Sequence, residues 1–132
     1  MSTNLTAKTK ALLLVTMEAP ASFEEEFNDW YDFEHLPQRL AMPGFENGGR
    51  FVCLEGWPRW LALYDLSSRA ALETPEYLAV SLSNATPWSR RVAARTIGRA
   101  RIVLDQIAPG GAVITPRDKL SRLAVARFGR VA

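Results

Sequence analysis

The sequence contains one cysteine, Cys53, and one histidine, His35, in 132 residues. A single cysteine excludes a disulfide within the chain and fits a reducing compartment, so we expect a cytoplasmic protein. The apolar neighbours of Cys53 predict a buried strand cysteine rather than a reactive thiol. One histidine without a cysteine cluster leaves only scattered carboxylates as metal ligands, so we expect no metal site.

Low-complexity tracts and long apolar runs are also missing. The apolar run 11-ALLLVTM-17 ends at Glu18, whereas a membrane-spanning helix needs about 20 apolar residues. A chain of 132 residues is long enough for one domain with its own core. We predict a single domain over residues 1–132, with the core at 10–107 and a C-terminal extension at 110–132.

Charge is unevenly distributed, although the net charge is only +2. Residues 1–66 carry 5 Lys/Arg against 10 Asp/Glu, and residues 67–132 carry 11 against 4. This asymmetry fits a nucleic-acid surface, self-association of acidic and basic faces, or an anionic substrate. The basic segment 90-RRVAARTIGRAR-101 lacks an aromatic stacking motif for RNA, so we expect no nucleic-acid partner.

Four segments have the composition of strands. Lys10–Met17 is apolar without alternation, as in a strand buried on both faces. Phe45–Gly56, with a possible bulge at Gly48-Gly49, and Arg59–Leu66 are spaced as an antiparallel hairpin. Ile97–Ile107 is the last predicted strand.

Capping signals predict the helices. The sequence 22-SFEE-25 is a capping box that opens a helix, and Pro37 predicts its end near Leu36. A threonine followed by a proline then occurs three times and favours a helix start each time. These pairs, Thr74-Pro75, Thr86-Pro87 and Thr115-Pro116, predict helices at about 75–84, 87–95 and 116–128.

The order of elements is therefore β-α-β-β-α-β with an extra C-terminal helix. This order predicts an α+β fold, a ferredoxin-like sandwich with helices on one face of an antiparallel sheet. The other sheet face is also apolar, and an uncovered apolar face indicates a partner. We predict that two copies pair through their sheets.

The end of the first helix contains the residues best suited to chemistry. On a helical wheel, Glu34 continues the apolar stripe of Phe23, Phe27 and Trp30. A carboxylate in that direction is costly unless it is paired or protonated, which raises its pKa in principle. His35 follows directly, and histidine moves protons most readily near neutral pH.

A purely structural explanation is also open. A histidine near a helix C-terminus often interacts with the helix dipole, and Glu34 can pair with Arg39 or Arg50. Residues alone do not decide between the structural and the chemical interpretation of this segment.

The segment 27-FNDWYDFEHLPQRLAMPGF-45, followed by Arg50-Phe51 and 61-LALYDL-66, resembles the EthD-like family of the dimeric α+β-barrel superfamily. The resemblance covers about residues 10–107, and 86-TPWSRR-91 is similar to a recurring element of bacterial members. It implies a homodimer with a pocket between the sheet and helices of each subunit. Members include isomerases, cyclases and cofactor-free monooxygenases, and their motif histidine corresponds to His35. The segment 110–132 departs from the shorter members.

The resulting hypothesis is a cofactor-independent enzyme of the isomerase, cyclase, lyase or decarboxylase type, acting on an apolar carbonyl or carboxylate substrate. His35 is the expected acid or base, Glu34 orients it, and Tyr64 donates to a developing enolate oxygen. The expected substrate-binding residues are Trp30, Tyr31, Arg50, Trp60 and Trp88, with Arg50 as the carboxylate receptor.

Three alternatives use the same residues. The first is a non-catalytic protein that binds a small ligand in the same pocket. The second is a cofactor-free monooxygenase. The third has His35 as an axial haem ligand.

Overall fold

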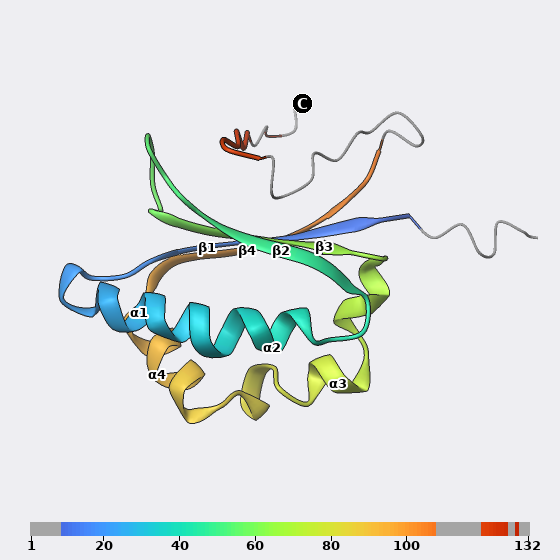
Figure 1. Cartoon of the computed structure of the whole chain (residues 1–132), viewed down its shortest axis with the longest axis horizontal. Helices are drawn as coiled ribbons and strands as arrows, with labels where there is room; N and C mark the ends of the chain where they lie inside the picture. The colour runs from blue at the N-terminus through green and yellow to red at the C-terminus, as the bar shows by residue number, and fades with distance from the viewer. Residues whose placement is uncertain (1–8, 108–119, 127–128, 130–132) are drawn as a thin grey trace, which may run out of the picture.

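The computed structural model describes residues 9–107, 120–126 and 129. Its centre is a 4-stranded antiparallel sheet with the strand order β2-β3-β1-β4 (Figure 1). The strands are β1 (Ala11–Glu18), β2 (Phe45–Val52), β3 (Trp60–Leu66) and β4 (Ile97–Asp105). The predicted hairpin of β2 and β3 is confirmed, with Arg50 opposite Ala62.

All helices pack against one face of this sheet (Figure 1). They are α1 (Glu24–Trp30), a π-helical turn (Tyr31–His35), α2 (Leu36–Leu40), α3 (Pro75–Leu78) and α4 (Pro87–Arg95). Short 3-10 turns precede α1 at Ala21–Phe23 and flank α3 at Arg69–Leu72 and Leu82–Asn84. The strand order and the one-sided helices confirm the predicted α+β, ferredoxin-like fold.

The core lies between the helices and the inner face of the sheet. Side chains of a strand alternate between faces, so Leu13 and Met17 of β1 point inward beside Ala62 and Tyr64 of β3. From the helices, aromatic side chains fill the other side, and Phe27 is completely buried. The remaining buried members are Ala11, Ala19, Phe23, Trp30, Tyr31, Phe45, Leu66, Ala71, Tyr77 and Val92.

The sequence predicts that the first helix ends before Pro37, but in the structure it continues. A π-helical turn, in which the Leu36 N–H donates to the Tyr31 carbonyl, connects α1 to α2. Pro37 then lies in the first turn of α2, where a backbone N–H is not needed for the helix. The wider turn thus lets one continuous helical segment pass a proline, and the helix extends to Leu40.

Both described threonine caps are confirmed. Thr74 accepts a hydrogen bond from the Tyr77 N–H at 3.1 Å, and Thr86 accepts one from the Ser89 N–H at 3.0 Å. The helix after Thr74 ends at Leu78 rather than near residue 84. The Val80 N–H donates to the carbonyl of Tyr77, three residues earlier, at 3.3 Å. This spacing of three residues closes the helix with a 3-10 turn.

Two strand ends and the irregularity of the hairpin differ from the sequence predictions. β2 stops at Val52, and β4 stops at Asp105. The register shift in β2 lies between Phe45 and Asn47, where the chain leaves the Gly44 turn, and not at Gly48-Gly49. Gly44 has a φ of 85°, which favours glycine at this turn.

The predicted helix over 116–128 is wrong for the part that the structure describes. Residues 120–126 have no helical structure, and 121–126 are exposed. A short segment that buries no apolar stripe does not gain enough to form a stable helix. Thr115, its predicted cap, lies outside the described residues.

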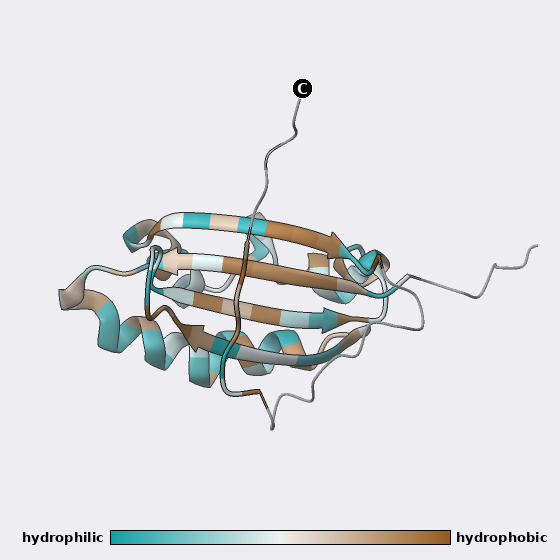
Figure 2. Ribbon diagram, turned by 90° about the horizontal axis from the view of Figure 1, so that it is seen from above, coloured by the Kyte–Doolittle hydropathy of each residue, from teal (hydrophilic) through white to brown (hydrophobic). Residues whose placement is uncertain are grey.

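The sheet face opposite the helices is apolar and carries no helix in the described part of the chain. Leu14 and Leu63 are 3% exposed there, although they do not belong to the core between sheet and helices. The segment 120–126 crosses this face (Figure 2). A hollow of about 1060 Å³ lies between the face, the loop 53–58 and residues 121–125.

Within the described ranges, every helix is too short or too polar to cross a bilayer.

Candidate functional site

His35 lies on the inner side of the molecule because the π-helical turn rotates it toward the aromatic core. Its ring stacks on Trp30, with centroids 4.3 Å apart and planes 24° apart. It also meets the edge of Tyr31 at 5.2 Å. The residue as a whole is half-buried, but its Nδ1 atom is fully buried and has no hydrogen-bond partner among the described residues.

The surroundings of His35 keep its imidazole neutral. Burial, together with the positive charges of Arg39, Arg99 and Arg50, lowers its pKa from 6.5 to about 3. A neutral imidazole with a free buried nitrogen can accept or donate one hydrogen bond to a bound molecule.

Two buried tyrosines lie beside this histidine. Burial raises the pKa of Tyr31 to about 12, although nearby arginines oppose the shift. Burial also raises the pKa of Tyr64 above its usual range, and the neighbouring Tyr31 adds to this. The Tyr64 hydroxyl has no geometrically satisfied hydrogen-bond partner in the described residues. Tyr64 is therefore a protonated phenol, and its hydroxyl lies close enough to Tyr31 to oppose the rise in the pKa of Tyr31 through a hydrogen bond.

Arg50 covers the aromatic cluster from β2. Its guanidinium lies 4.3 Å from the ring centre of Tyr31 and 5.1 Å from that of Trp60. It also pairs with Asp32 at 2.9 Å and donates to the side chain of Asn28 at 2.6 Å. The predicted carboxylate receptor is thus already occupied by protein groups.

Trp60, at the start of β3, belongs to the same aromatic cluster. Its Nε1 atom is buried without a hydrogen-bond partner in the described residues. Its ring lies 6.3 Å from Phe27, which is completely buried. Trp60 therefore adds a second free donor to the aromatic cluster around Arg50.

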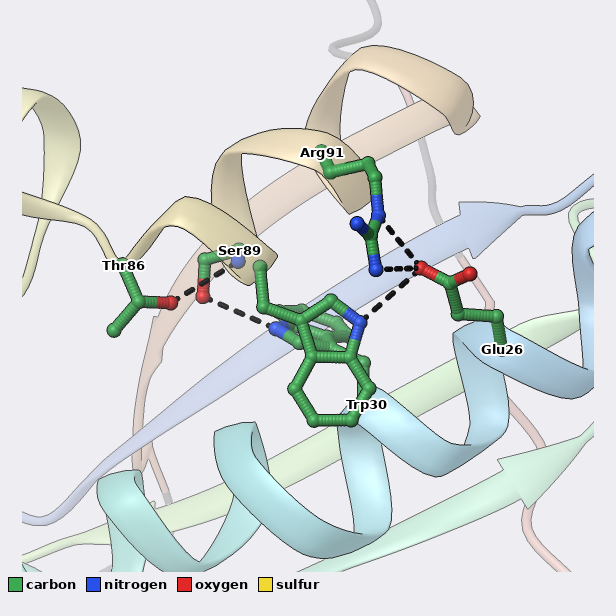
Figure 3. A network of polar contacts seen from close by, with 6 residues as sticks. Glu26, Trp30, Thr86, Ser89 and Arg91 are labelled. Carbon is green, nitrogen blue, oxygen red and sulfur yellow. Dashed lines mark hydrogen bonds and ion pairs between the residues drawn. The ribbon is translucent and has the colours of Figure 1, made fainter.

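Glu34 faces α4 rather than His35. Its carboxylate accepts hydrogen bonds from Thr86 Oγ1 at 2.7 Å and from Ser89 Oγ at 3.2 Å. Ser89 Oγ in turn accepts a bond from Trp30 Nε1 at 3.0 Å (Figure 3). The helical wheel fails here because it assumes an α-helix, whereas the π-helical turn moves Glu34 to the N-terminus of α4.

Trp88 lies at the contact between α1 and α4. Its Nε1 donates to Glu26 at 3.3 Å, and Glu26 also pairs with Arg91 at 2.6 Å. Figure 3 shows Glu26 and Arg91 pointing toward each other across this contact. The structure gives Trp88 a partner on α1, and its role in substrate binding stays a prediction.

The structure therefore gathers most of the predicted residues around one aromatic cluster. His35, Trp30 and Tyr31 come from the first helical segment, and Tyr64 and Trp60 come from β3. Glu34 reaches this cluster only through Ser89, which bonds both Glu34 and Trp30. The Thr86-Pro87 pair indicates the cap, whereas no sequence pattern indicates the contact of Ser89 with Glu34.

The described residues include no group of three or more His, Cys, Asp or Glu side chains placed to hold a metal ion.

No family model matches this sequence, and the search of curated proteins gave no match. Solved structures do resemble it. A putative antibiotic biosynthesis monooxygenase from Nitrosomonas europaea is 19% identical with a TM-score of 0.55, covering 77% of this chain and 94% of the other. SnoaB, a cofactor-independent oxygenase from Streptomyces nogalater, is 12% identical with a TM-score of 0.56, covering 78% and 98%.

A third similar structure is an EthD family protein from Bacillus halodurans. It is 16% identical with a TM-score of 0.50, covering 75% of this chain and 99% of the other. At these identities the likeness concerns the fold. The chain has the ferredoxin-like α+β fold of these proteins, and its resemblance to the EthD-like proteins is confirmed at that level.

Proposed function

We propose that this protein is a cofactor-independent enzyme that binds a small, largely apolar carbonyl or carboxylate compound between its helices and sheet and transfers a proton through His35. One observation carries the proposal. His35 Nδ1, the Tyr64 hydroxyl and Trp60 Nε1 are all buried on the inner side without hydrogen-bond partners in the described residues. Unpaired buried polar atoms are costly, and they are usually explained by a function or a bound group.

The chemistry that suits these atoms is proton abstraction next to a carbonyl group. His35 takes the proton from the carbon beside the carbonyl group, the electron pair of the C–H bond forms the C=C bond of an enolate, and the π pair of the C=O bond moves to the oxygen. Tyr64 and Trp60 then donate hydrogen bonds to the oxygen that becomes negative. Because burial keeps Tyr64 protonated, it can act as a donor throughout the physiological pH range.

The aromatic side chains around His35 hold the apolar part of the substrate. Trp30 and Tyr31 form its wall on the helix side, and Trp60 forms it on the sheet side. Such a mostly apolar lining with a few polar atoms is typical of small-molecule sites. Glu34 orients Trp30 through Ser89 and so supports the surface on which His35 stacks.

The test is turnover of simple carbonyl acids and phenolic ketones, with substrate consumption and deuterium exchange from solvent as readouts. Exchange at the carbon beside the carbonyl detects proton abstraction even when no product accumulates. His35→Gln and Tyr64→Phe should each lower the exchange rate by about 100-fold or more. Exchange that persists in His35→Gln would contradict the assignment of the base.

A second candidate is a non-catalytic protein that binds the same kind of molecule. The lowered pKa of His35 favours it, because a base of such low pKa takes up protons poorly near neutral pH. Tight binding without exchange in the wild-type protein would establish this function in place of catalysis.

Oxygenation is the third candidate, since similar folds include a cofactor-independent oxygenase. An oxygenase would use the same proton abstraction by His35, and its activity would be detected as oxygen consumption that depends on substrate. A Soret band on addition of haem would instead indicate a haem protein and would contradict the cofactor-free proposal.

A further inference from the structure

Arg39, Arg99 and Arg101 surround the inner site without an ion pair to any carboxylate in the described part of the chain. They come from α2 and from the inner side of β4, where Arg101 lies opposite Val15 of β1. Arg50, by contrast, pairs with Asp32 and Asn28. The excess positive charge at the site therefore belongs to these three arginines.

Tyr77 of α3 holds two of these arginines close together. The Arg39 guanidinium lies 5.0 Å from the centre of the Tyr77 ring, and Arg101 Nη2 donates to the Tyr77 hydroxyl at 3.2 Å. Two like charges on one phenol repel each other, and this repulsion is relieved when an anion binds between them. Tyr77 is itself buried and stacks on Phe45, so its ring has little freedom to move away.

The same arginines act on the proposed base. Arg39 and Arg99 both lower the pKa of His35, and Arg39 also lowers that of Tyr64. The charged groups nearest this site also include Asp32, which is paired with Arg50, and Glu34, which is bonded to α4. Neither carboxylate offsets the three arginines by an ion pair.

We propose that Arg39, Arg99 and Arg101 form the anion-binding end of the site and that they select substrates with a carboxylate beside an apolar, preferably aromatic, group. This inference rests on the proposed function and names its substrate class. Guanidinium groups match carboxylates in shape and bind them with two hydrogen bonds. The bound anion also offsets the charges that disfavour a protonated His35, so that the substrate makes the imidazole a better base.

The positions of these arginines favour an anionic substrate as one explanation for the uneven charge of the sequence. The basic C-terminal half contributes Arg99 and Arg101 through β4, whereas the acidic N-terminal half contributes the helix that carries His35. An anionic substrate therefore accounts for the position of these two arginines. Other arginines of the C-terminal half form ion pairs outside the site: Arg91 pairs with Glu26, and Arg69 pairs with Asp105.

The experiment compares 2-naphthoate with 2-naphthamide, which has the same ring system without the charge. Protein labelled at its single histidine reports binding through the imidazole nitrogen signals of His35. The variants are Arg39→Gln and Arg99→Gln. Arg69→Gln is the matched control, because it removes the same charge from an arginine that pairs with Asp105 outside the site.

We expect the wild-type protein to bind naphthoate at least about tenfold more tightly than naphthamide, as for hydrogen bonds to charged groups. Arg39→Gln and Arg99→Gln should each remove most of this preference, while Arg69→Gln keeps it. The pKa of His35 should rise in the naphthoate complex.

Equal affinity for the two compounds, or a preference that both variants retain, would overturn this inference and leave the proposed function standing. No change at His35 with either compound at millimolar concentration would overturn both.

Discussion

At the scale of single residues, the site is defined by buried polar atoms without hydrogen-bond partners among the described residues. His35 and Tyr64 both have such atoms, and burial favours the neutral form of both side chains. The effect of each side chain on the free energy of unfolding can therefore be measured separately from its effect on ligand chemistry. Substitutions that remove an unpaired polar atom should affect ligand chemistry more than folding.

The pH dependence of stability tests the environment of His35. Its pKa is about 3 in the folded protein and 6.5 in the unfolded chain, so the unfolded state holds more protons between these values. Stability is therefore complete above pH 6.5 and falls as the pH decreases toward 3. Between pH 7 and pH 5, wild-type protein should lose about 1–2 kcal/mol relative to His35→Gln, measured by urea unfolding.

The control is the NMR titration of the imidazole in the same pH range. The signals should not change between pH 5 and pH 8 if the folded pKa is about 3. A midpoint near 6.5 with a pH-independent difference between wild type and variant would show a solvated histidine and contradict the buried site.

Tyr64→Phe should leave the free energy of unfolding unchanged or raise it by up to about 1 kcal/mol, because the lost hydroxyl makes no hydrogen bond of good geometry to the described residues. Tyr77→Phe is the matched control, since its hydroxyl accepts a hydrogen bond from Arg101. That substitution should lower stability by about 1 kcal/mol in the same urea experiment. A larger loss for Tyr64→Phe than for Tyr77→Phe would mean that the Tyr64 hydroxyl is structural.

The sequence could predict which residues matter at this scale, but not their partners. His35 stood out because it is the only histidine, and Tyr64 as a tyrosine of the predicted strand Arg59–Leu66. The pairing of Arg50 with Asp32 and Asn28 depends on how β2 lies beside α1, and no local pattern indicates it. The orientation of long side chains was therefore beyond sequence reasoning.

At the scale of elements, the π-helical turn decides the geometry of the site. It places His35 against Trp30 and Tyr31, and it directs Glu34 toward the N-terminus of α4. The period of an α-helix predicted the wrong direction for Glu34, because a π-helical turn holds more residues per turn. The predicted caps were right, since each depends on a threonine and the N–H three residues later.

The bond between Thr86 and Glu34 should make the cap of α4 stronger than that of α3. Thr74→Ala loses only a helix cap and should cost about 1 kcal/mol of stability. Thr86→Ala loses the cap and the bond to Glu34, so we expect a cost of about 2 kcal/mol. Thermal or urea unfolding of the two variants gives the comparison directly.

A double-mutant cycle isolates the contact between the helices. Thr86→Ala combined with Glu34→Gln should show a coupling energy of about 1 kcal/mol, because the partners are 2.7 Å apart. Thr74→Ala combined with Glu34→Gln should be additive. Equal costs for the two threonine variants, with no coupling, would show that Glu34 does not hold α4 to the first helix.

At the scale of the whole molecule, the two faces of the sheet have different roles. The inner face carries the aromatic site under the helices, and the outer face presents apolar side chains without helical cover. The sequence predicted both, because β1 is apolar on both sides rather than alternating. It did not predict that residues 120–126 cross the outer face, since their helical pattern is not realised.

The outer face gives the last prediction, which concerns the proposed dimer. Ile102 lies on this face near the middle of the edge strand β4, opposite Leu14 on β1. Ile102→Lys places a charge there, so it should convert a dimer into a monomer in analytical ultracentrifugation while the fold is retained. Ile107→Lys is the control, because Ile107 follows β4 and is 93% exposed. A wild-type chain that is already monomeric would contradict the dimer, and would assign the cover of this face to the segment 120–126.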